Sequence, residues 1–348
     1  MTRKSRIKVL QIAPSLGVHG GIEAVAVSIV QECAAESDID CHLFFRQRGK
    51  GALADDFTEL ISPYSDRISL FRKNPLPLIK AMLRTDIVHC HYPALWVLIP
   101  AFLLGKSTLI TVHNKKPPGK ILLRFFERVA LRMVNKVVFN SNFVAGTWGF
   151  RDGDFERVPA VAESNRRIRP SDERSGFIVL ARLIPEKGIG ILIKAYQRAS
   201  IDHLSHPLLI VGTGPQMEEL RQLASQGKSD QIRFLGHRHG DDKARLLAAA
   251  LWNIAPAVYQ EDQGMTPIEA SLCRVPSIVS AVGGLPESAG PGAIMVTPHD
   301  VDELSKALEL AVGMKSEEYE KRCFLNEEYL KKYLPIPRHY PLCYSNLI

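Results

Sequence analysis

The chain has 348 residues, of which 46% are hydrophobic and 23% are charged, as in an ordinary globular protein that folds. Its length exceeds the size at which a single core stops growing, so we expect two domains with a cleft between them. The formal net charge of +7 predicts a negatively charged partner, which could be nucleic acid, an anionic membrane surface or a phosphorylated ligand.

Neither a membrane span nor a signal peptide is expected. The longest apolar run, residues 94–104, covers eleven residues and contains Pro100, whereas a membrane-spanning helix needs ~20 residues. The run 7–13 follows a basic N-terminus and ends at Pro14 without a small-residue cleavage site, which is typical of a strand. The six cysteines are scattered without a Cys-x-x-Cys pair, so we expect reduced core thiols in a cytosolic protein.

Short β-rich runs alternate with helical patterns along nearly the whole chain, which predicts parallel sheets covered by helices on both faces. A polar stretch at 163–176 interrupts the pattern, and we place the domain boundary there. The expected division is residues 1–168, residues 169–330 and a C-terminal helical tail, 331–348, that returns to the N-terminal domain. The predicted strands are 7–13, 41–45, 86–90, 108–112 and 136–140, then 177–181, 207–211, 231–235, 252–256, 276–280 and 293–297.

Two features of the first half lie where a doubly wound sheet keeps its ligand site. Gly20 and Gly21 connect the first strand to a helix whose free N–H groups suit an anion, although glycines are common in any such turn. His113 ends a later strand and could donate to a hydroxyl or stabilise a developing charge. His89 and His91 also end a strand, and we expect them to face opposite sides so that only one points at a ligand.

The second half contains a cationic turn after its first strand. Arg182 and Lys187 precede an amphipathic helix and form a clamp suited to a diphosphate, since Arg bonds in a bidentate manner and Lys acts as a point charge. The run Gly212-Thr213-Gly214-Pro215 begins like a dinucleotide fingerprint, but Met217 stands where its last glycine is required. We therefore do not infer NAD.

The most informative stretch is residues 261–270, which follows the strand at 252–256. Gly264 allows a tight turn into a helix, and the amides of Gly264, Met265 and Thr266 would point at a phosphate. Glu269, inside that helix, can accept hydrogen bonds from both hydroxyls of a ribose. Glu261 lies eight positions earlier in the same stretch.

These motifs, in this order, resemble the GT-B glycosyltransferases called group 1 or family 4, which carry a Glu-x7-Glu motif here. The resemblance implies two Rossmann-like domains. It implies that Arg182 and Lys187 bind the donor diphosphate, that Glu269 binds the ribose, and that Glu261 and His113 lie near the transferred sugar. Gly236 and His237 resemble the segment that lines the nucleobase. The matching residues are Gly20, Gly21, His113, Arg182, Lys187, Glu261, Gly264, Glu269 and the run Gly283-Gly284-Leu285-Pro286-Glu287.

One departure concerns the end of the first domain, where Ala160-Val161 replaces the family's frequent Asn-Gly and leaves the donor less certain. The resemblance implies retention of the anomeric configuration, with the leaving phosphate accepting the acceptor's proton. Fixed cations and amides at the phosphate should supply most of the catalysis. The predicted catalytic residues are Arg182 and Lys187 at the phosphate, with Glu261 and His113 near the sugar. Two Asp-x-Asp triplets, at 38–40 and 152–154, lie in turn-like surroundings, so we expect no cofactor and no obligatory metal.

Basic residues recur every four positions from residue 120 onward, which predicts one basic stripe on an amphipathic helix. Such a stripe suits an anionic membrane surface, although a solvated helix face has the same pattern. The predicted docking residues are Lys120, Arg124, Arg128, Arg132 and Lys136.

The resulting hypothesis is a retaining glycosyltransferase that uses a UDP- or GDP-linked sugar. Its acceptor would be a polysaccharide, lipopolysaccharide or other lipid-linked glycan of the cell envelope. The enzyme would be cytoplasmic and peripherally bound to the inner face of the membrane. Alternatives are a nucleotide-sugar epimerase of the same fold and a non-catalytic homologue that binds nucleotide or sugar. Nucleic-acid binding lacks a recognition module here.

Overall fold

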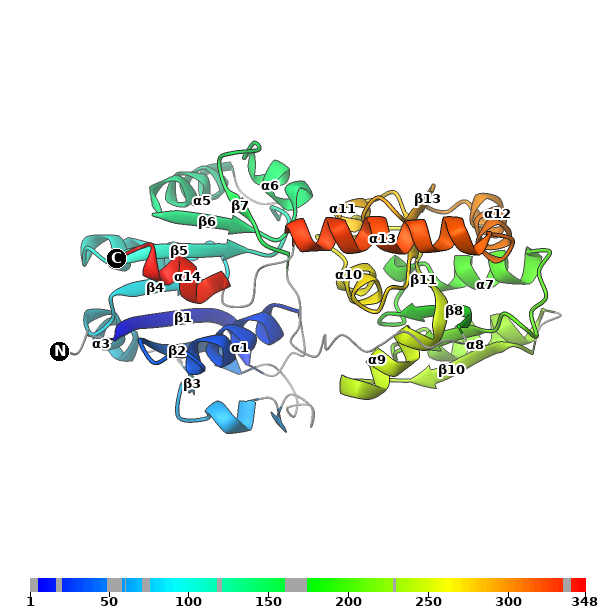
Figure 1. Ribbon diagram of the computed structural model, residues 1–348. Helices are drawn as coiled ribbons and strands as arrows, with labels where there is room; N and C mark the ends of the chain where they lie inside the picture. Colours follow the sequence, from blue (N-terminus) through cyan, green and yellow to red (C-terminus); the bar gives the residue numbers. More distant parts are fainter. Residues whose placement is uncertain are drawn as a thin grey trace. The chain divides into compact units, whose positions relative to one another are not determined.

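The computed structural model describes residues 6–16, 21–48, 58–59, 61–70, 76–117, 121–159, 174–227, 230–333 and 339–348. The chain divides into two compact units, which are described separately below. The first unit comprises Met1–Glu163 and Leu334–Ile348, and the second comprises Ser164–Tyr333. The end of the chain therefore belongs to the unit in which the chain begins (Figure 1).

The first unit contains a sheet of seven strands in the order β3-β2-β1-β4-β5-β6-β7, and all its pairings are parallel. The order reverses between β1 and β4, which is the point where doubly wound sheets bind ligands. The strands are β1 Ile7–Leu16, β2 Ile39–Arg48, β3 Ile68–Leu70, β4 Ile87–Cys90, β5 Ser107–Val112, β6 Lys136–Phe139 and β7 Glu156–Arg157. The helices are α1 Gly21–Ala34, η1 Ser62–Tyr64, α3 Leu76–Leu83, α4 Leu95–Leu103, α5 Ile121–Met133, α6 Asn142–Trp148 and α14 His339–Ser345.

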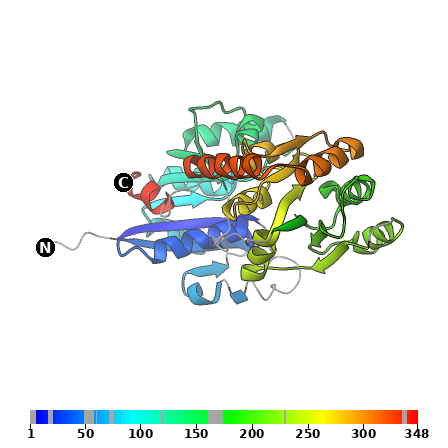
Figure 2. The same ribbon diagram turned by 45° about the vertical axis from the view of Figure 1, so that its right-hand side comes forward.

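The second unit contains a parallel sheet of six strands in the order β10-β9-β8-β11-β12-β13. Its switch point lies between β8 and β11. The strands are β8 Ser175–Leu180, β9 Leu208–Val211, β10 Ile232–Gly236, β11 Ala250–Ala255, β12 Ser277–Ser280 and β13 Ile294–Val296. The helices are η2 Pro185–Lys187, α7 Ile189–Arg198, α8 Met217–Ser225, α9 Gly240–Ala249, α10 Met265–Leu272, α11 Leu285–Ala289, α12 Val301–Val312 and α13 Ser316–Tyr333. In Figure 2 the colours of this unit run along the chain from green at β8 to orange-red at α13.

The prediction of two doubly wound units of parallel strands is confirmed, and every strand predicted from the sequence is present within three residues of its expected ends. The strands β3 and β7 are not predicted from the sequence; they have three and two residues and pair with the sheet on one side only. An edge strand of this length has no room for the alternating or continuous apolar pattern that marks a strand.

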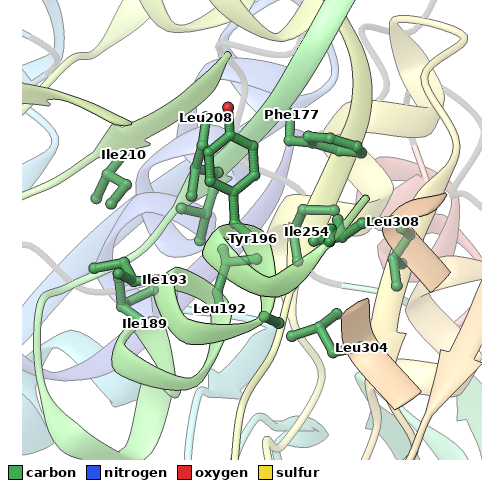
Figure 3. Close-up of a cluster of buried hydrophobic side chains, with 14 of the residues drawn as sticks. Phe177, Ile189, Leu192, Ile193, Tyr196, Leu208, Ile210, Ile254, Leu304 and Leu308 are labelled. Atoms are coloured by element: carbon green, nitrogen blue, oxygen red, sulfur yellow. The ribbon is translucent and has the colours of Figure 1, made fainter. Parts of the chain in front are cut away.

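Each sheet is covered on both faces by amphipathic helices. On the second unit, α7 places Ile189, Leu192 and Tyr196 against Phe177 and Leu208 of the sheet (Figure 3). Tyr196 is fully buried and its hydroxyl donates to the carbonyl of His206 at 2.8 Å. Burying each of these large side chains contributes roughly 1.5–3 kcal/mol, so the rigid sheet that holds the loops is stabilised mainly by this packing.

The C-terminal helix α14 completes the core of the first unit. Tyr340, Cys343 and Tyr344 are buried in the cluster that also holds the residues of α1, β1 and β2. Tyr344 is fully buried, and its hydroxyl lies 2.7 Å from Nδ1 of His89 on β4. The hydroxyl of Tyr340 lies 3.2 Å from Oγ1 of Thr111 on β5. The tail thus contributes both apolar area and hydrogen bonds to this unit.

Candidate functional site

The functional loops of the second unit follow β8 and β11, the two neighbouring strands at its switch point. Arg182 and Lys187 follow β8, while Glu261 and the helix α10 follow β11. Because parallel strands place their carboxyl ends at one edge of the sheet, the cationic turn and the acidic loop lie side by side there. The structure therefore brings together residues that are 74 positions apart in the chain.

Lys187 and Glu261 form an ion pair between these two loops. Their side chains are 27% and 21% exposed, so the pair is partly shielded from water but still reachable by a ligand. The loops are also joined through their backbones, because the N–H of Val258 donates to the carbonyl of Glu186 at 3.0 Å. Arg182 is exposed and has no side-chain partner among the residues that the structure describes.

The helix α10 begins directly after Gly264, as the sequence predicts. Gly264 has φ 88°, and a Cβ there would lie 2.4 Å from Cδ2 of Leu285, so a larger residue would be strained and crowded. The first turn of α10 contains Met265 and Thr266, whose free amides provide the positive end of the helix dipole. Oγ1 of Thr266 is 3.5 Å from the carbonyl of Leu180, which ties the helix start to the end of β8.

Glu269 is paired with a residue that the sequence analysis missed. Nζ of Lys243, on α9, lies 2.8 Å from Oε1 of Glu269. The side chain of Glu269 is only 6% exposed and that of Lys243 is 20% exposed, so this is a largely buried ion pair. No pattern in the sequence connects a lysine on one helix with a glutamate 26 positions later on another.

The glycine pair Gly283-Gly284 supports the loop that carries Glu261. The N–H of Gly284 donates to the carbonyl of Glu261 at 2.8 Å. A Cβ on Gly283, which has φ 58°, would lie 2.1 Å from that same carbonyl oxygen. These glycines are therefore needed for close approach between two backbones, and their effect on a ligand is indirect.

Gly236 ends β10 with φ 70°, and its carbonyl accepts from the N–H of Gly212 at 2.8 Å. His237 follows directly, with its ring 6.0 Å from that of His239. A Cβ on Gly212 would lie 1.9 Å from the carbonyl oxygen of Ala181. The glycine run at 212–214 thus serves close packing of the loop after β9 against the loop after β8.

Three buried histidines lie at the carboxyl ends of β4 and β5 in the first unit. The prediction that His89 and His91 face opposite sides is wrong, because their ring centroids are 4.4 Å apart. Successive residues of a strand alternate between faces, so residues two apart share one face. Nδ1 of His91 lies 3.2 Å from Nε2 of His113, and burial lowers the pKa of His113 from 6.5 to about 4.

The predicted glycine turn of the first unit is only partly described, since Gly20 lies outside the described residues. Gly21 begins α1 as expected. Glu23, in the first turn of α1, accepts a hydrogen bond from Oγ of Ser15 at 3.2 Å. The replacement at Ala160-Val161 also lies outside the described residues.

The predicted basic stripe is wrong at its C-terminal end, because α5 ends at Met133 and Lys136 begins β6. Nζ of Lys136 pairs with Glu156 at 2.6 Å, and Arg128 donates to the carbonyl of Gly149 at 3.1 Å. Arg132 is exposed. Lys120 lies outside the described residues, as does the side chain of Arg124.

Among the side chains of α5 that the structure describes, most of the exposed ones are apolar. Phe125 is 61% exposed and Met133 is 53% exposed. The helix α4, which contacts α5, adds further exposed apolar side chains. We call the exposed apolar residues described on the two helices the α4–α5 patch: Ile99, Phe102, Leu103, Phe125, Phe126, Val129 and Met133.

The other side chains that could bind a metal are the cysteines, one cluster on α14 and β7, and the two Asp-x-Asp triplets. All six cysteines are buried and free, as expected. Glu156, His339 and Cys343 offer ligand atoms within 4.8 Å of one another. The ammonium of Lys136, 2.6 Å from Glu156 and 3.2 Å from Sγ of Cys343, already supplies the positive charge of this cluster. It anchors α14 to β6 and β7. Of the Asp-x-Asp pairs, Asp40 lies on β2 beside His42, and Asp152 and Asp154 lie in a turn.

Within the described residues, no helix is long and apolar enough to cross a membrane.

This chain is similar to two curated relatives, and in each the matched segment spans less than half of the relative's length. The GDP-mannose-dependent monoacylated alpha-(1-6)-phosphatidylinositol monomannoside mannosyltransferase of Corynebacterium glutamicum is 37% identical over 162 residues, 43% of this chain and 42% of that protein. The O-antigen chain mannosyltransferase B of Escherichia coli is 34% identical over 131 residues, 37% of this chain and 34% of that protein.

Solved structures share the fold over nearly the whole chain. HepE of Anabaena in complex with UDP has a TM-score of 0.81 at 16% identity, over 98% of this chain and 99% of that one. The lipopolysaccharide outer core galactosyltransferase WaaB has a TM-score of 0.69 at 16% identity, again over 98% and 99%. Two family models match consecutive segments, Glycosyltransferase Family 4 over residues 19–158 and Glycosyl transferases group 1 over residues 161–325. The chain therefore belongs to the group 1 glycosyltransferases of the GT-B fold.

Proposed function

We propose that this glycosyltransferase moves a sugar from a nucleotide-diphosphate donor to a lipid-linked or polysaccharide acceptor with retention of the anomeric configuration. The observation that carries the proposal is the joining of two loops at the switch point of the second sheet. One loop supplies Arg182 and Lys187, and the other supplies Glu261 and the free N-terminus of α10. The two cationic side chains and the N-terminus of α10 thus lie at one edge of the sheet, where they could bind the two phosphates of the donor.

The pairing of Lys187 with Glu261 suggests how the donor is received. In the structure, the carboxylate of Glu261 pairs with the ammonium of Lys187. A diphosphate is a stronger partner for Lys187, and its binding would free Glu261 to accept hydrogen bonds from the hydroxyls of the sugar. Arg182, already exposed, would add a bidentate contact to the same diphosphate. These fixed cations would stabilise the charge that develops on the leaving phosphate.

Glu269 is placed four residues into α10, beyond the amides that would bind phosphate. A carboxylate accepts two hydroxyl hydrogens, so we assign it to the ribose. Gly236 and His237, after β10, would lie near the base. The UDP bound to HepE and the GDP-mannose named for the Corynebacterium relative make UDP- and GDP-linked sugars the first donors to test. We propose that no metal is required, because the clamp supplies the charge that a metal would otherwise provide.

The acceptor proposal rests on the α4–α5 patch. An apolar, aromatic surface of this kind on a helix that also carries basic residues is suited to the boundary between headgroups and acyl chains. The named acceptors of the two relatives are a phosphatidylinositol mannoside and an O-antigen chain. We therefore propose a lipid-linked glycan acceptor at the inner face of the membrane, with the enzyme bound peripherally.

A thermal-shift screen over UDP, GDP and ADP tests the donor site, since a bound ligand raises the apparent stability by mass action. The preferred nucleotide should raise the melting temperature equally with and without EDTA. Glu269→Ala should lose most of the shift, whereas Glu218→Ala, on the exposed surface of α8, should keep it. An unchanged shift in Glu269→Ala would disprove the ribose assignment.

The corresponding nucleotide sugar then tests the reaction. NMR of the product should show a new glycosidic bond with the configuration of the donor. Free epimerised sugar in place of a transfer product would support the epimerase alternative, and binding without any turnover of donor and acceptor would support the non-catalytic one.

A further inference from the structure

A chain of buried hydrogen bonds leads through the first unit to His113. Nε2 of Gln11 donates to Sγ of Cys41 at 3.1 Å, and Oε1 of Gln11 lies 2.8 Å from Nε2 of His91. Nδ1 of His91 in turn lies 3.2 Å from Nε2 of His113. Gln11 is fully buried and His91 is 1% exposed, so water does not compete for these bonds.

The chemistry of these groups decides which nitrogen carries each proton. An amide oxygen only accepts, so the proton between Gln11 and His91 belongs to Nε2 of His91. Burial lowers the pKa of His91 well below its ordinary value, so the ring is neutral at pH 7 and carries one proton. Its Nδ1 therefore has a lone pair, and the proton between the two histidines is the one on Nε2 of His113.

The same reasoning fixes the other side of His113. Burial lowers the pKa of His113 to about 4, so this ring is also neutral at pH 7. With its proton on Nε2, it has a lone pair on Nδ1. Among the residues that the structure describes, Nδ1 of His113 has no hydrogen-bond partner. The backbone of His113 is held separately, because Nδ2 of Asn140 donates to its carbonyl at 2.7 Å.

We propose that Gln11 and His91 are positioning residues that hold His113 in the Nε2-protonated tautomer and present its Nδ1 to the ligand as a hydrogen-bond acceptor. This inference rests on the proposed function for the ligand itself, a hydroxyl of the transferred sugar. A hydroxyl can donate to Nδ1, whereas a phosphate oxygen or a carbonyl, which only accept, cannot bond there. His113 would thus select a hydroxyl at this position and would not act as a cation.

The orientation of the Gln11 amide determines which ring nitrogen carries the proton in both His91 and His113. If the amide of Gln11 were reversed, its Nε2 would donate to His91, and the protons of both histidines would move to the opposite nitrogens. In the structure Nε2 of Gln11 donates to the sulfur of Cys41, and this orientation leaves Oε1 facing Nε2 of His91. A residue two side chains away from His113 therefore determines which of its nitrogens can accept.

Two-bond ¹H–¹⁵N correlation NMR of the histidine-labelled protein at pH 7 tests this directly, because protonated and unprotonated ring nitrogens resonate far apart. Wild type should show His113 with a protonated Nε2 and an unprotonated Nδ1. Gln11→Leu removes the acceptor that faces Nε2 of His91 and should mix the two tautomers of His91 and His113. A wild-type His113 protonated on Nδ1 would overturn the inference without any variant.

Steady-state kinetics with the donor from the thermal-shift screen separates this inference from the proposed function. Gln11→Leu should lower kcat at least about tenfold and leave the Kd of the nucleoside diphosphate unchanged, since the diphosphate is assigned to the other unit. If the tautomer is as stated but His113→Ala keeps full transfer, the proposed role of His113 fails. If His113→Ala abolishes transfer while Gln11→Leu changes neither tautomer nor kcat, the positioning role fails.

Discussion

Nζ of Lys243 lies 2.8 Å from Oε1 of Glu269, and the side chain of Glu269 is 6% exposed. A carboxylate this deeply buried has lost most of its hydration, and the ammonium beside it supplies a hydrogen bond in place of the lost water. Lys243 therefore has a role of its own, since its ammonium holds the carboxylate of Glu269 in place on α10. A ribose bound at Glu269, as proposed above, would meet a carboxylate that is already oriented.

Replacing Lys243 by Met should destabilise the second unit by about 2 kcal/mol, because it leaves a buried carboxylate without its charged hydrogen-bond donor. The double variant Lys243→Met/Glu269→Gln should recover part of this loss, since a neutral amide is less costly to bury than an unpaired charge. Urea denaturation measures both free energies of unfolding. Arg245→Met, on the same helix with a 71% exposed side chain, is the control and should change stability by less than about 0.5 kcal/mol. A comparable loss in the control would contradict the assignment.

Gly283→Ala should impair catalysis more than folding. The added Cβ would meet the carbonyl oxygen of Glu261 at 2.1 Å, so the loop that carries this carboxylate must move. A displacement of about 1 Å at a reacting group can cost about 100-fold in rate, and we expect kcat/KM for the donor to fall by that order. The measurement is the rate of donor turnover, with circular dichroism as a check of folding.

The matched control is Gly146→Ala, inside α6, where the added Cβ meets nothing within 4 Å. Alanine is favoured over glycine in a helix, so this variant should be neutral or slightly stabilising and fully active. Equal activity in the two alanine variants would show that the contact between Gly283 and Glu261 does not position the loop.

The first unit should lose stability as the pH falls from 7 to 5. His113 has a folded-state pKa of about 4 because burial disfavours its charged form, whereas an unfolded histidine titrates near 6.5. Below pH 6.5 the unfolded chain gains a proton that the folded chain excludes, so the stabilisation present above that pH is progressively lost. His113 alone should contribute about 2 kcal/mol of this loss by pH 5. Burial shifts His89 and His91 in the same direction.

Urea denaturation followed by the fluorescence of Trp96 and Trp148 reports on the first unit when Trp252, in the second, is replaced by Phe. His113→Gln should reduce the dependence of the unfolding free energy on pH, because one of the three shifted groups is gone. A stability that rises on acidification would contradict the assigned direction.

The α4–α5 patch should bind anionic vesicles through apolar contacts as well as charge. The double variant Phe125→Ser/Phe126→Ser should sediment with phosphatidylglycerol vesicles several-fold less than wild type, at equal net charge. Phe324→Ser, which removes a phenylalanine that is 56% exposed on α13, is the control and should bind as wild type does. Equal sedimentation of wild type with zwitterionic vesicles in low salt would argue against a preference for anionic lipid.

The strands of both sheets could be predicted from the sequence, because buried parallel strands are continuous apolar runs, such as Leu208–Val211 on β9. It was also sufficient to place Arg182, Lys187, Glu261 and Glu269 after strands of one sheet, since the loops at one edge follow from the topology. The predicted family and the predicted fold are both confirmed.

Specific pairs between side chains could not be predicted in the same way. Lys243 and Glu269 meet because α9 and α10 pack together, and that geometry exists only after the second unit has folded. Lys136 continues the four-residue repeat of basic residues in the sequence, but α5 ends before it. Its ammonium instead pairs with Glu156 on the neighbouring strand β7. The orientation of His89 and His91 was predicted wrongly, because residues two apart in a strand point to the same face of the sheet.

The return of α14 to the first unit has a consequence for biosynthesis. A ribosome releases the chain from its N-terminus onward, and an N-terminal domain normally folds before the next domain is complete. Here the core around β1 and β2 needs Tyr340 and Tyr344, and Tyr344 is also the partner of His89. The second unit, whose residues are all made earlier than α14, can fold while the first still lacks a helix. The first unit of the nascent chain should therefore complete its fold after the second, once α14 has left the exit tunnel.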